Sequence, residues 1–467
     1  MTGPEIAPGT EPRSVDRRPF SWAEVLWPVA IGTVLVVVSM WVVDQGPERL
    51  TDAGTRLDSI GLLTGLLSSD LLLLQVVMLA RIPWVERAWG HDLLARRHGR
   101  MGFASFWLMI VHVAAFALLR LAEGSRSAVQ VLWQVFVRDP WMVWATIGTV
   151  LLVGVVVTSV RAARRRLRYE SWHLLHLYAY VGVAFALPHQ IVDGPDFRSP
   201  LRQLYWWGLY IAAAGAILAF RVGQPAWRSW IHRLRVVSVT TEAPGVVSVM
   251  VEGRRLERLR TRSGQFFIWR FLDGPGWTRG NPYTISAAPT DDRLRVTIRA
   301  DGDGSSRAGR LRVGMRVLIE GPYGTMTAGV RRKPRMLLMA AGVGITPIRA
   351  LLEDTPYEPG DATLIYRFTE PGRAIFTDEI TTIAAARGVE VHLLAGSRRA
   401  EGSWQSAVGV PDGADVDDAA ALRALVPDLG QSDVFVCGPP AWTSAVRRAA
   451  RRNGVPREQI HTETFAW

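Results

Sequence analysis

Six long apolar runs within the first 222 residues constrain this 467-residue chain more than any other feature. A helix needs about 20 mostly apolar residues to cross the hydrocarbon core of a bilayer. The runs lie at about Trp22–Val43, Ser59–Ala80, Met101–Leu121, Pro140–Val160, Ser171–Ile191 and Leu204–Phe220. The sequence therefore predicts a transmembrane domain of six helices over residues 21–222. Residues 1–20 are polar and proline-containing, which predicts a disordered cytoplasmic tail rather than a cleavable signal peptide.

Arginines flank the apolar runs unevenly. The net charge is +12, which in a soluble protein would raise the possibility of nucleic-acid binding. Here the basic residues gather in the tail, after the second run, in the segment RAARRRLR (161–168) and after the sixth run. Basic loops stay in the cytoplasm, so this pattern predicts a multi-pass protein of the cell membrane with both termini cytoplasmic. No nucleic-acid partner is expected.

Four histidines stand at similar intervals in two of the predicted helices. His98 and His112 are 14 residues apart, and His176 and His189 are 13 apart. These intervals correspond to roughly 20 Å along a helix, which is enough to place one histidine near each membrane face. Ionisable residues inside a membrane usually mark function, and two imidazoles suit a haem iron. The spacing predicts two b-type haems, one held by His98 and His176 and the other by His112 and His189.

Two details leave alternatives for these ligands. In a regular helix His189 would lie on a different face from His176, so we expect Pro188 to distort the helix and turn His189 inward. His173 is the alternative to His176 at the inner haem. His91 is expected in a cytoplasmic loop, with a structural role.

The single cysteine, Cys437, excludes an intrachain disulfide and an iron–sulfur cluster held by four cysteines of this chain.

The hydrophobic pattern changes after about residue 230. Short alternating segments with glycine and proline turns predict an antiparallel β-barrel over residues 230–328. From Arg335 onward, apolar strands alternate with helical segments, which predicts a parallel α/β nucleotide-binding domain over residues 334–467. The predicted fold is thus multi-domain.

Three motifs in this half suggest ligand binding. In AAGVGITP (Ala340–Pro347), Gly342 and Gly344 would let backbone amides approach a phosphate at a helix start, although the motif also suits a tight strand–helix turn. NPYTIS (Asn281–Ser286) places an aromatic ring beside hydroxyls, as a stacking site for a flat ring or as barrel core. GDGSS (Gly302–Ser306) suits an anion-binding turn or a plain hairpin loop.

Together, the motifs resemble those of the ferric reductase and NADPH oxidase superfamily, with a flavin domain of the ferredoxin–NADP reductase type. The resemblance covers nearly everything after residue 21. It implies FAD, NADPH (or NADH) and two haems as cofactors. The histidine spacings of 14 and 13 match those of the family's haem ligands.

The resemblance also implies roles at the flavin. Tyr283 would stack on the isoalloxazine and Thr284 would hydrogen-bond near its reactive nitrogen. Asn281 stands where the family often has Arg or His, with Arg279 as a possible substitute. Glu463 would lie near the flavin. The remaining implied flavin contacts are Pro282, Gly304, Ser305 and Ser306, with Phe465, or alternatively Trp467, covering the ring.

The nucleotide would bind at the glycine-rich turn. The family resemblance assigns it Gly342, Gly344, Thr346 and Pro347, with Cys437 and Gly438 approaching the nicotinamide. Arg367, Ser397 and Arg398 match positions that hold a 2′-phosphate, which favours NADPH over NADH. The implied catalytic residues are Tyr283, Thr284, Cys437, Glu463 and Phe465.

The resemblance implies a membrane flavocytochrome oxidoreductase that passes electrons from cytoplasmic NAD(P)H through FAD and two haems to an extracytoplasmic acceptor. The acceptor is a small molecule or a metal ion, dioxygen or ferric iron, and the outer loops do not decide between them. One alternative is an electron-supply subunit for a membrane or periplasmic partner protein, whose identity is unknown. Another is a six-span transporter or sensor with a regulatory nucleotide domain.

Overall fold

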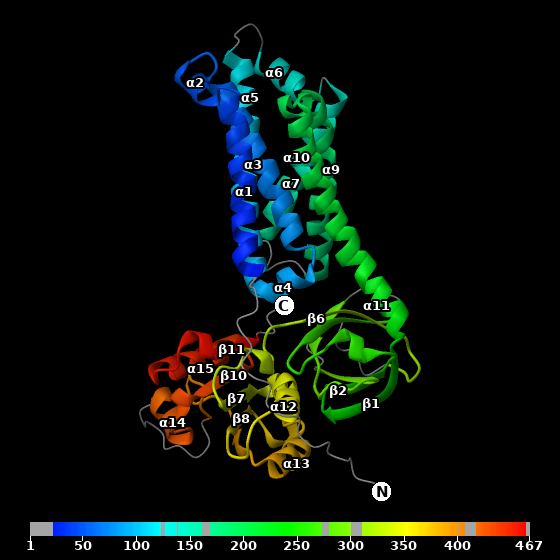
Figure 1. The fold of residues 1–467 in the computed structure, drawn as a ribbon, viewed down its shortest axis with the longest axis vertical. Coiled ribbons are helices and arrows are strands. Elements are labelled where there is room, and N and C mark those ends of the chain that lie inside the picture. The colour runs from blue at the N-terminus through cyan, green and yellow to red at the C-terminus, as the bar shows by residue number, and fades with distance from the viewer. Residues whose placement is uncertain are drawn as a thin grey trace. The chain divides into compact units, whose positions relative to one another are not determined.

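A computed structural model describes residues 22–122, 127–137, 139–160, 169–272, 280–299, 311–400, 402–406 and 417–463. The chain divides into two compact units. The first runs to Val150 and also takes in Val183–Ala213, and the second consists of Leu151–Gly182 and the chain from Ala214 onward. Figure 1 shows the order of the elements along the chain.

In the described residues before residue 233, the regular elements are helices. They are α1 (Trp22–Val43), α2 (Gly46–Thr51), α3 (Arg56–Met78), α4 (Pro83–Trp89), α5 (His91–Ala122), α6 (Ala128–Phe136), α7 (Pro140–Ser159), α9 (Tyr169–Asp193), the short η1 (Pro195–Arg198), α10 (Pro200–Ala216), the π-helical η2 (Ile217–Gly223) and α11 (Gln224–His232).

Five of these helical stretches are long and apolar enough to cross a membrane. They are Arg56–Met78, Leu93–Ala122, Pro140–Ser159, Ser171–Asp193 and Pro200–His232. The predicted first span is also a helix, α1, but its apolar stretch in the described residues, Trp27–Val43, is shorter. The prediction of a helical, multi-pass N-terminal region is confirmed to this extent, and the count of six spans stays a prediction.

Small residues let α3 and α5 pack closely. The Ser68 hydroxyl donates to the Ser105 carbonyl at 2.8 Å, and the Ser105 hydroxyl donates back to the Ser68 carbonyl at 2.9 Å. On α3, Gly61 and Gly65 face Phe116 and His112, so closely that a Cβ at either glycine would overlap the ring. Small side chains and interhelical hydrogen bonds are the usual way for membrane helices to associate. Here they fix the position of the His112 ring.

Two antiparallel three-stranded sheets follow. The first has the order β1 (Arg235–Ala243), β2 (Val246–Glu252), β5 (Arg293–Arg299), and the second β4 (Asn281–Thr284), β3 (Phe266–Phe271), β6 (Val317–Tyr323). Alternate residues of both sheets point into one core, in which Val249, Trp269 and Ile319 are fully buried. The predicted antiparallel domain is therefore present as two sheets around a shared core, and its closure into a barrel stays a prediction.

The last part is a parallel five-stranded sheet with the order β11-β10-β7-β8-β9. The strands are β7 (Arg335–Ala341), β8 (Ala362–Phe368), β9 (Glu390–Ala395), β10 (Ser432–Cys437) and β11 (Ile460–Glu463), and the helices are α12 (Ile345–Asp354), α13 (Thr377–Arg387), α14 (Asp418–Leu425) and α15 (Pro440–Arg452).

Helices cover both faces of this parallel sheet. Leu338 of β7 packs in one core with α12 and α13, while its neighbours Leu337 and Met339 pack in another with α14 and α15. Successive strand residues point to opposite faces, so a continuous apolar strand is what a sheet covered on both sides requires.

Candidate functional site

The strand order places a topological switch point between β7 and β10. The chain leaves β7 toward β8 on one side of the sheet and leaves β10 toward β11 on the other. In open α/β sheets, ligands bind outside the carboxyl ends of the strands at such a point. The predicted nucleotide residues lie here, because Gly342 and Gly344 follow β7 and Gly438 follows β10.

The glycines of this turn meet distinct steric requirements. Gly342 has a φ of +57°, a conformation that side chains disfavour. A Cβ at Gly344 would lie 2.2 Å from the carbonyl oxygen of Cys437. The turn after β7 therefore packs backbone to backbone against the end of β10.

The predicted flavin strand lies against this turn. Thr284 at the end of β4 is buried, and its Oγ1 is 3.0 Å from Oγ1 of the buried Thr346, which itself donates to the Val343 carbonyl at 3.0 Å. Since the Thr346 proton goes to Val343, the Thr284 hydroxyl is the donor in the shared bond. Tyr283 is half-buried beside it, and burial raises the pKa of its phenol, so the ring stays neutral.

Glu463 and Cys437 lie on neighbouring strands, and the two residues are paired in the β10–β11 register. A Cβ at Gly324, just after β6, would lie 3.6 Å from a Glu463 carboxylate oxygen. Cys437 is fully buried, and burial together with the charge of Glu463 raises the pKa of its thiol well above the ordinary value. The thiol is therefore protonated at neutral pH and is unsuited to act as a nucleophile.

Arg367, Ser397 and Arg398 lie at the carboxyl ends of the adjacent strands β8 and β9. Arg367 is buried and donates to the Gly396 carbonyl at 3.0 Å, while Ser397 and Arg398 are exposed. Burial and the nearby charge of Arg398 lower the pKa of Arg367. Within the described residues neither guanidinium forms an ion pair, so two neighbouring cations are available to an anionic group.

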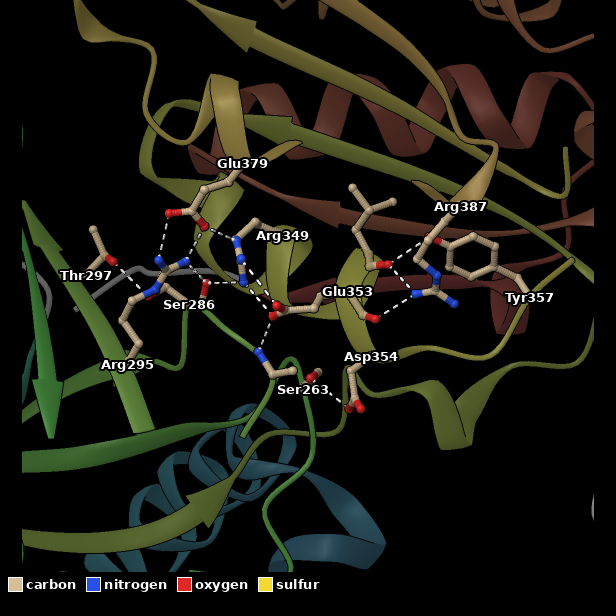
Figure 2. A network of polar contacts seen from close by, with 12 residues as sticks. Ser263, Ser286, Arg295, Thr297, Arg349, Glu353, Asp354, Tyr357, Glu379 and Arg387 are labelled. Atoms are coloured by element: carbon tan, nitrogen blue, oxygen red, sulfur yellow. Dashed lines mark hydrogen bonds and ion pairs between the residues drawn. The ribbon is translucent and has the colours of Figure 1, made fainter. Parts of the chain in front are cut away.

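A network of polar contacts joins the antiparallel sheets to the α/β part (Figure 2). Arg295 of β5 forms two bonds to Glu379 of α13, at 2.8 and 2.9 Å. Arg349 of α12 contacts the same carboxylate at 2.6 Å and Glu353 at 2.5 Å. Both arginines also donate to the Ser286 carbonyl, two residues after Thr284.

Sequence reasoning missed this network. The four-residue interval between Arg349 and Glu353 on one helix was the only local signal. The network fixes α12, which carries Thr346, against the strand that carries Thr284.

Among the membrane-region histidines, His112 and His189 face each other. Their ring centres are 6.3 Å apart, with the planes tilted by 47°. Nδ1 of His112 is 2.8 Å from the Gly61 carbonyl, and Nδ1 of His189 is 2.5 Å from the Ala186 carbonyl. A carbonyl only accepts, so each Nδ1 carries the proton and each Nε2 is the nitrogen with a lone pair.

The distance between the ring centres suits a metal bound by both rings. A metal–imidazole bond is about 2 Å long, and the ring centre lies about 1 Å behind the nitrogen, so two axial imidazoles have ring centres about 6 Å apart. An Nδ1–H held by a backbone carbonyl is also the usual outer support of a metal-bound histidine. His112 and His189 would therefore fit as the two ligands of a haem iron.

His176 carries its Nδ1 proton in the same way. The Ser159 hydroxyl has one proton, which it donates to the Val155 carbonyl at 2.7 Å. It therefore accepts a hydrogen bond from His176 Nδ1 at 3.3 Å and another from Trp172 Nε1 at 3.3 Å. His98 belongs to the first unit and His176 to the second, and their sharing of a haem stays a prediction, as does the choice between His176 and His173.

Several predicted residues lie outside the described part of the chain. They are Arg279, Gly304, Ser305, Ser306, Phe465 and Trp467. Asn281 and Pro282 are described in β4, paired with Trp269 and Ile268 of β3, and Pro347 lies in the first turn of α12.

Two families match this chain. Residues 64–187 match the ferric reductase like transmembrane component, which includes His98, His112, His176 and part of α9. Residues 338–448 match the oxidoreductase NAD-binding domain, which includes the turn after β7 and the end of β10.

Individual relatives match the second half. The ferredoxin reductase component of a 3-ketosteroid-9-alpha-monooxygenase from Mycolicibacterium smegmatis is 31% identical over 240 residues, or 49% of this chain and 63% of that protein. A stachydrine N-demethylase reductase subunit from Rhizobium meliloti is 29% identical over 240 residues, or 50% of this chain and 66% of that protein. The chain thus spans less than two thirds of these relatives. A solved ferredoxin reductase in carbazole 1,9a-dioxygenase aligns with a TM-score of 0.41 and 21% identity, over 50% of this chain and 69% of that one.

Proposed function

We propose that this electron-transfer oxidoreductase, which joins a ferric reductase-like transmembrane domain to an oxidoreductase NAD-binding domain, passes electrons from cytoplasmic NAD(P)H to an acceptor outside the membrane, with FAD and two b-type haems as its cofactors. The observation that carries the proposal is the His112–His189 pair, whose ring centres lie 6.3 Å apart with both Nδ1 protons held by backbone carbonyls. The acceptor is ferric iron or dioxygen.

The proposed NAD(P)H site lies at the switch point between β7 and β10. The pyrophosphate is assigned to the turn at Gly342 and Gly344, where backbone amides at the start of α12 would bind it. Arg367 and Arg398, with Ser397, supply two positive charges and a hydroxyl for a 2′-phosphate, which favours NADPH over NADH. The nicotinamide is assigned to the end of β10 at Gly438, and Cys437 acts there through its packing.

The proposed FAD site lies along β4. Bound FAD would supply the conversion of a two-electron hydride donor to single-electron steps. Thr284 presents a hydroxyl next to Thr346, Tyr283 presents a neutral ring for stacking, and Glu463 lies close by. The proposal assigns further flavin contacts to Arg279, Asn281, Pro282, Gly304, Ser305, Ser306, Phe465 and Trp467.

The membrane end comprises six spans, with α1 as the first, and both termini on the cytoplasmic side. His98 and His176 would hold the haem nearer the cytoplasm, and His112 and His189 the other. For His112 and His189 the protonated Nδ1 leaves Nε2 for the iron. Support comes from the match of residues 64–187 to the ferric reductase like transmembrane component.

Single histidine variants test the ligand assignment. His112→Ala should lower the haem content from two to one per chain, while NADPH still reduces the flavin at the normal rate. His173→Ala is the matched control from the same region and should keep both haems. Two haems in the His112→Ala protein, or a loss of haem in the His173→Ala protein, would refute the assignment.

A second candidate is an electron-supply role for a partner protein. The names of the relatives support it, because each is a reductase component or subunit of an oxygenase or demethylase system. Superoxide and ferrous iron formation by the purified protein with NADPH distinguish the two. Fast turnover with either acceptor favours the first function, while slow turnover that rises on adding a membrane fraction favours the second.

A further inference from the structure

A cavity of about 720 Å³ lies beside the end of α11, away from the switch point. Its wall comes from α11, the starts of β1 and β6, and the end of β2. Four arginines line it, Arg233, Arg235, Arg254 and Arg316, with Glu252 as the only acid. All four are exposed, and within the described residues none forms an ion pair. The cavity lining therefore carries a net positive charge, four arginines against one glutamate.

Hydrogen bonds hold the wall of this cavity in place. His232, the last residue of α11, is buried and its Nδ1 donates to the Arg254 carbonyl at 2.9 Å, while the Arg254 amide donates back to the His232 carbonyl at 2.7 Å. Arg228 of α11 donates to the Gly321 carbonyl of β6. The end of the helix is thus fastened to both sheets, and the cavity keeps its shape.

Two tryptophans on α11 stand out from this wall. Trp227 and Trp230 are 59% and 61% exposed, with ring centres 5.3 Å apart, and Trp230 lines the cavity. The two tryptophans are three residues apart on α11, so they share one side of the helix, and Arg233 follows directly after its last residue. Exposed tryptophans beside arginines are typical of the layer where lipid headgroups meet hydrocarbon.

The helix itself reaches such a layer. Pro200–His232 is one helical stretch of 33 residues and is apolar enough to span a membrane. At about 1.5 Å per residue it is about 50 Å long, compared with about 40–45 Å for a bilayer with its headgroups. In a bilayer that this stretch spans, its last turns, which carry the tryptophans and line the cavity, would lie at the headgroup level.

We propose that this cavity is a binding site for the headgroup of an anionic phospholipid. The arginines would pair with the phosphate, and Trp227 and Trp230 would lie among the first methylene groups of the acyl chains. The volume falls within the range of sites for small ligands. This site adds to the proposed electron transfer and does not depend on it.

Native mass spectrometry of the full-length protein with added lipid tests the proposal. With phosphatidylglycerol the wild type should retain one lipid that it does not retain with phosphatidylcholine. Arg254→Gln/Arg316→Gln should weaken this retention about tenfold or more, since each arginine near an anionic headgroup contributes substantially to binding. Arg451→Gln/Arg452→Gln, which removes the same charge from exposed positions on α15, should retain the lipid as the wild type does.

Three results would overturn the proposal. They are equal retention of the two lipids, equal retention by the cavity variant and the α15 variant, and displacement of the lipid by millimolar inorganic phosphate, which would make this a site for free anions. Flavin content and melting temperature, measured on each variant, show whether the protein is folded. Should the cavity variant not fold, Trp230→Ala replaces it, and unchanged retention by that variant would equally count against the site.

Discussion

Replacing Arg349 by methionine tests whether the network in Figure 2 holds the nucleotide turn against the flavin strand. The Arg349 side chain is 8% exposed and contacts Glu379, Glu353 and the Ser286 carbonyl. Methionine keeps most of the volume and removes the charge. Breaking a fully buried ion pair in this way costs about 3–5 kcal/mol.

The cost here should be smaller than that, for reasons visible in the structure. Glu379 and Glu353 are 35% and 34% exposed, so water partly solvates them after the change. Glu379 also keeps both bonds to Arg295, and Glu353 keeps the Ala288 amide. What is lost is one or two hydrogen bonds between charged groups, so we expect a loss of about 2 kcal/mol in the free energy of unfolding.

Thermal unfolding followed by FAD fluorescence measures this loss. For a domain of about 150–250 residues, each kcal/mol lowers the Tm by about 2–4 °C, so a loss of about 2 kcal/mol should lower it by about 4–8 °C. Stopped-flow reduction of the flavin by NADPH should also slow, because α12 carries Thr346. Arg373→Met is the matched control, since Arg373 and its partner Glu370 are 69% and 68% exposed, and it should change the free energy of unfolding by less than about 0.5 kcal/mol. Equal Tm values for the two variants would refute this account of the network.

Three further predictions concern single residues. Burial would raise the pKa of Asp433, but the hydrogen bond from His461 and two from backbone amides hold it below 3.8. Its contribution to stability is therefore full above about pH 4 and lost as the pH falls through the lowered pKa, so Asp433→Asn should flatten the dependence of the urea midpoint on pH between 5 and 2. Gly344→Ala places a Cβ against the Cys437 carbonyl and should cost about 1–3 kcal/mol while raising the KM for NADPH; Gly372→Ala, with open space around it, should change neither. Arg398→Ala should lower kcat/KM for NADPH by about 10- to 100-fold and leave that for NADH unchanged, and an equal loss with both nucleotides would contradict the 2′-phosphate role.

The helices of the first half were predictable because an apolar run of about 20 residues almost always forms a membrane-spanning helix. The predicted Trp22–Val43 matches α1. Other predicted boundaries differ from the observed helix ends, because an apolar run marks only the part of a helix inside the hydrocarbon layer, and the helix can extend beyond it. The predicted Met101–Leu121 is part of α5 (His91–Ala122), whose polar first turns are helical as well. The predicted Leu204–Phe220 continues through a π-helical segment to His232, which periodicity did not indicate.

The parts of the candidate site that a short motif forms were predictable. The contacts that join distant segments of the chain were not. The turn at Gly342 and Gly344 is readable because glycine is required there by backbone geometry. The contact between Thr284 and Thr346 joins residues 62 apart, and the Arg295–Glu379 pair joins residues 84 apart. Such contacts depend on how the sheets pack, which no short sequence pattern records.

The proposed function requires that NADPH oxidised on the cytoplasmic side reduces haem in the membrane. An absorption spectrum of the purified full-length protein, reconstituted with FAD and haem and recorded before and after anaerobic addition of NADPH, tests it most directly. We predict two b-type haems per FAD, both reduced by NADPH with the band shifts of iron held by two histidines. Protein that binds FAD and oxidises NADPH but holds no haem, or holds haem that NADPH does not reduce, would rule out transmembrane electron transfer through haem.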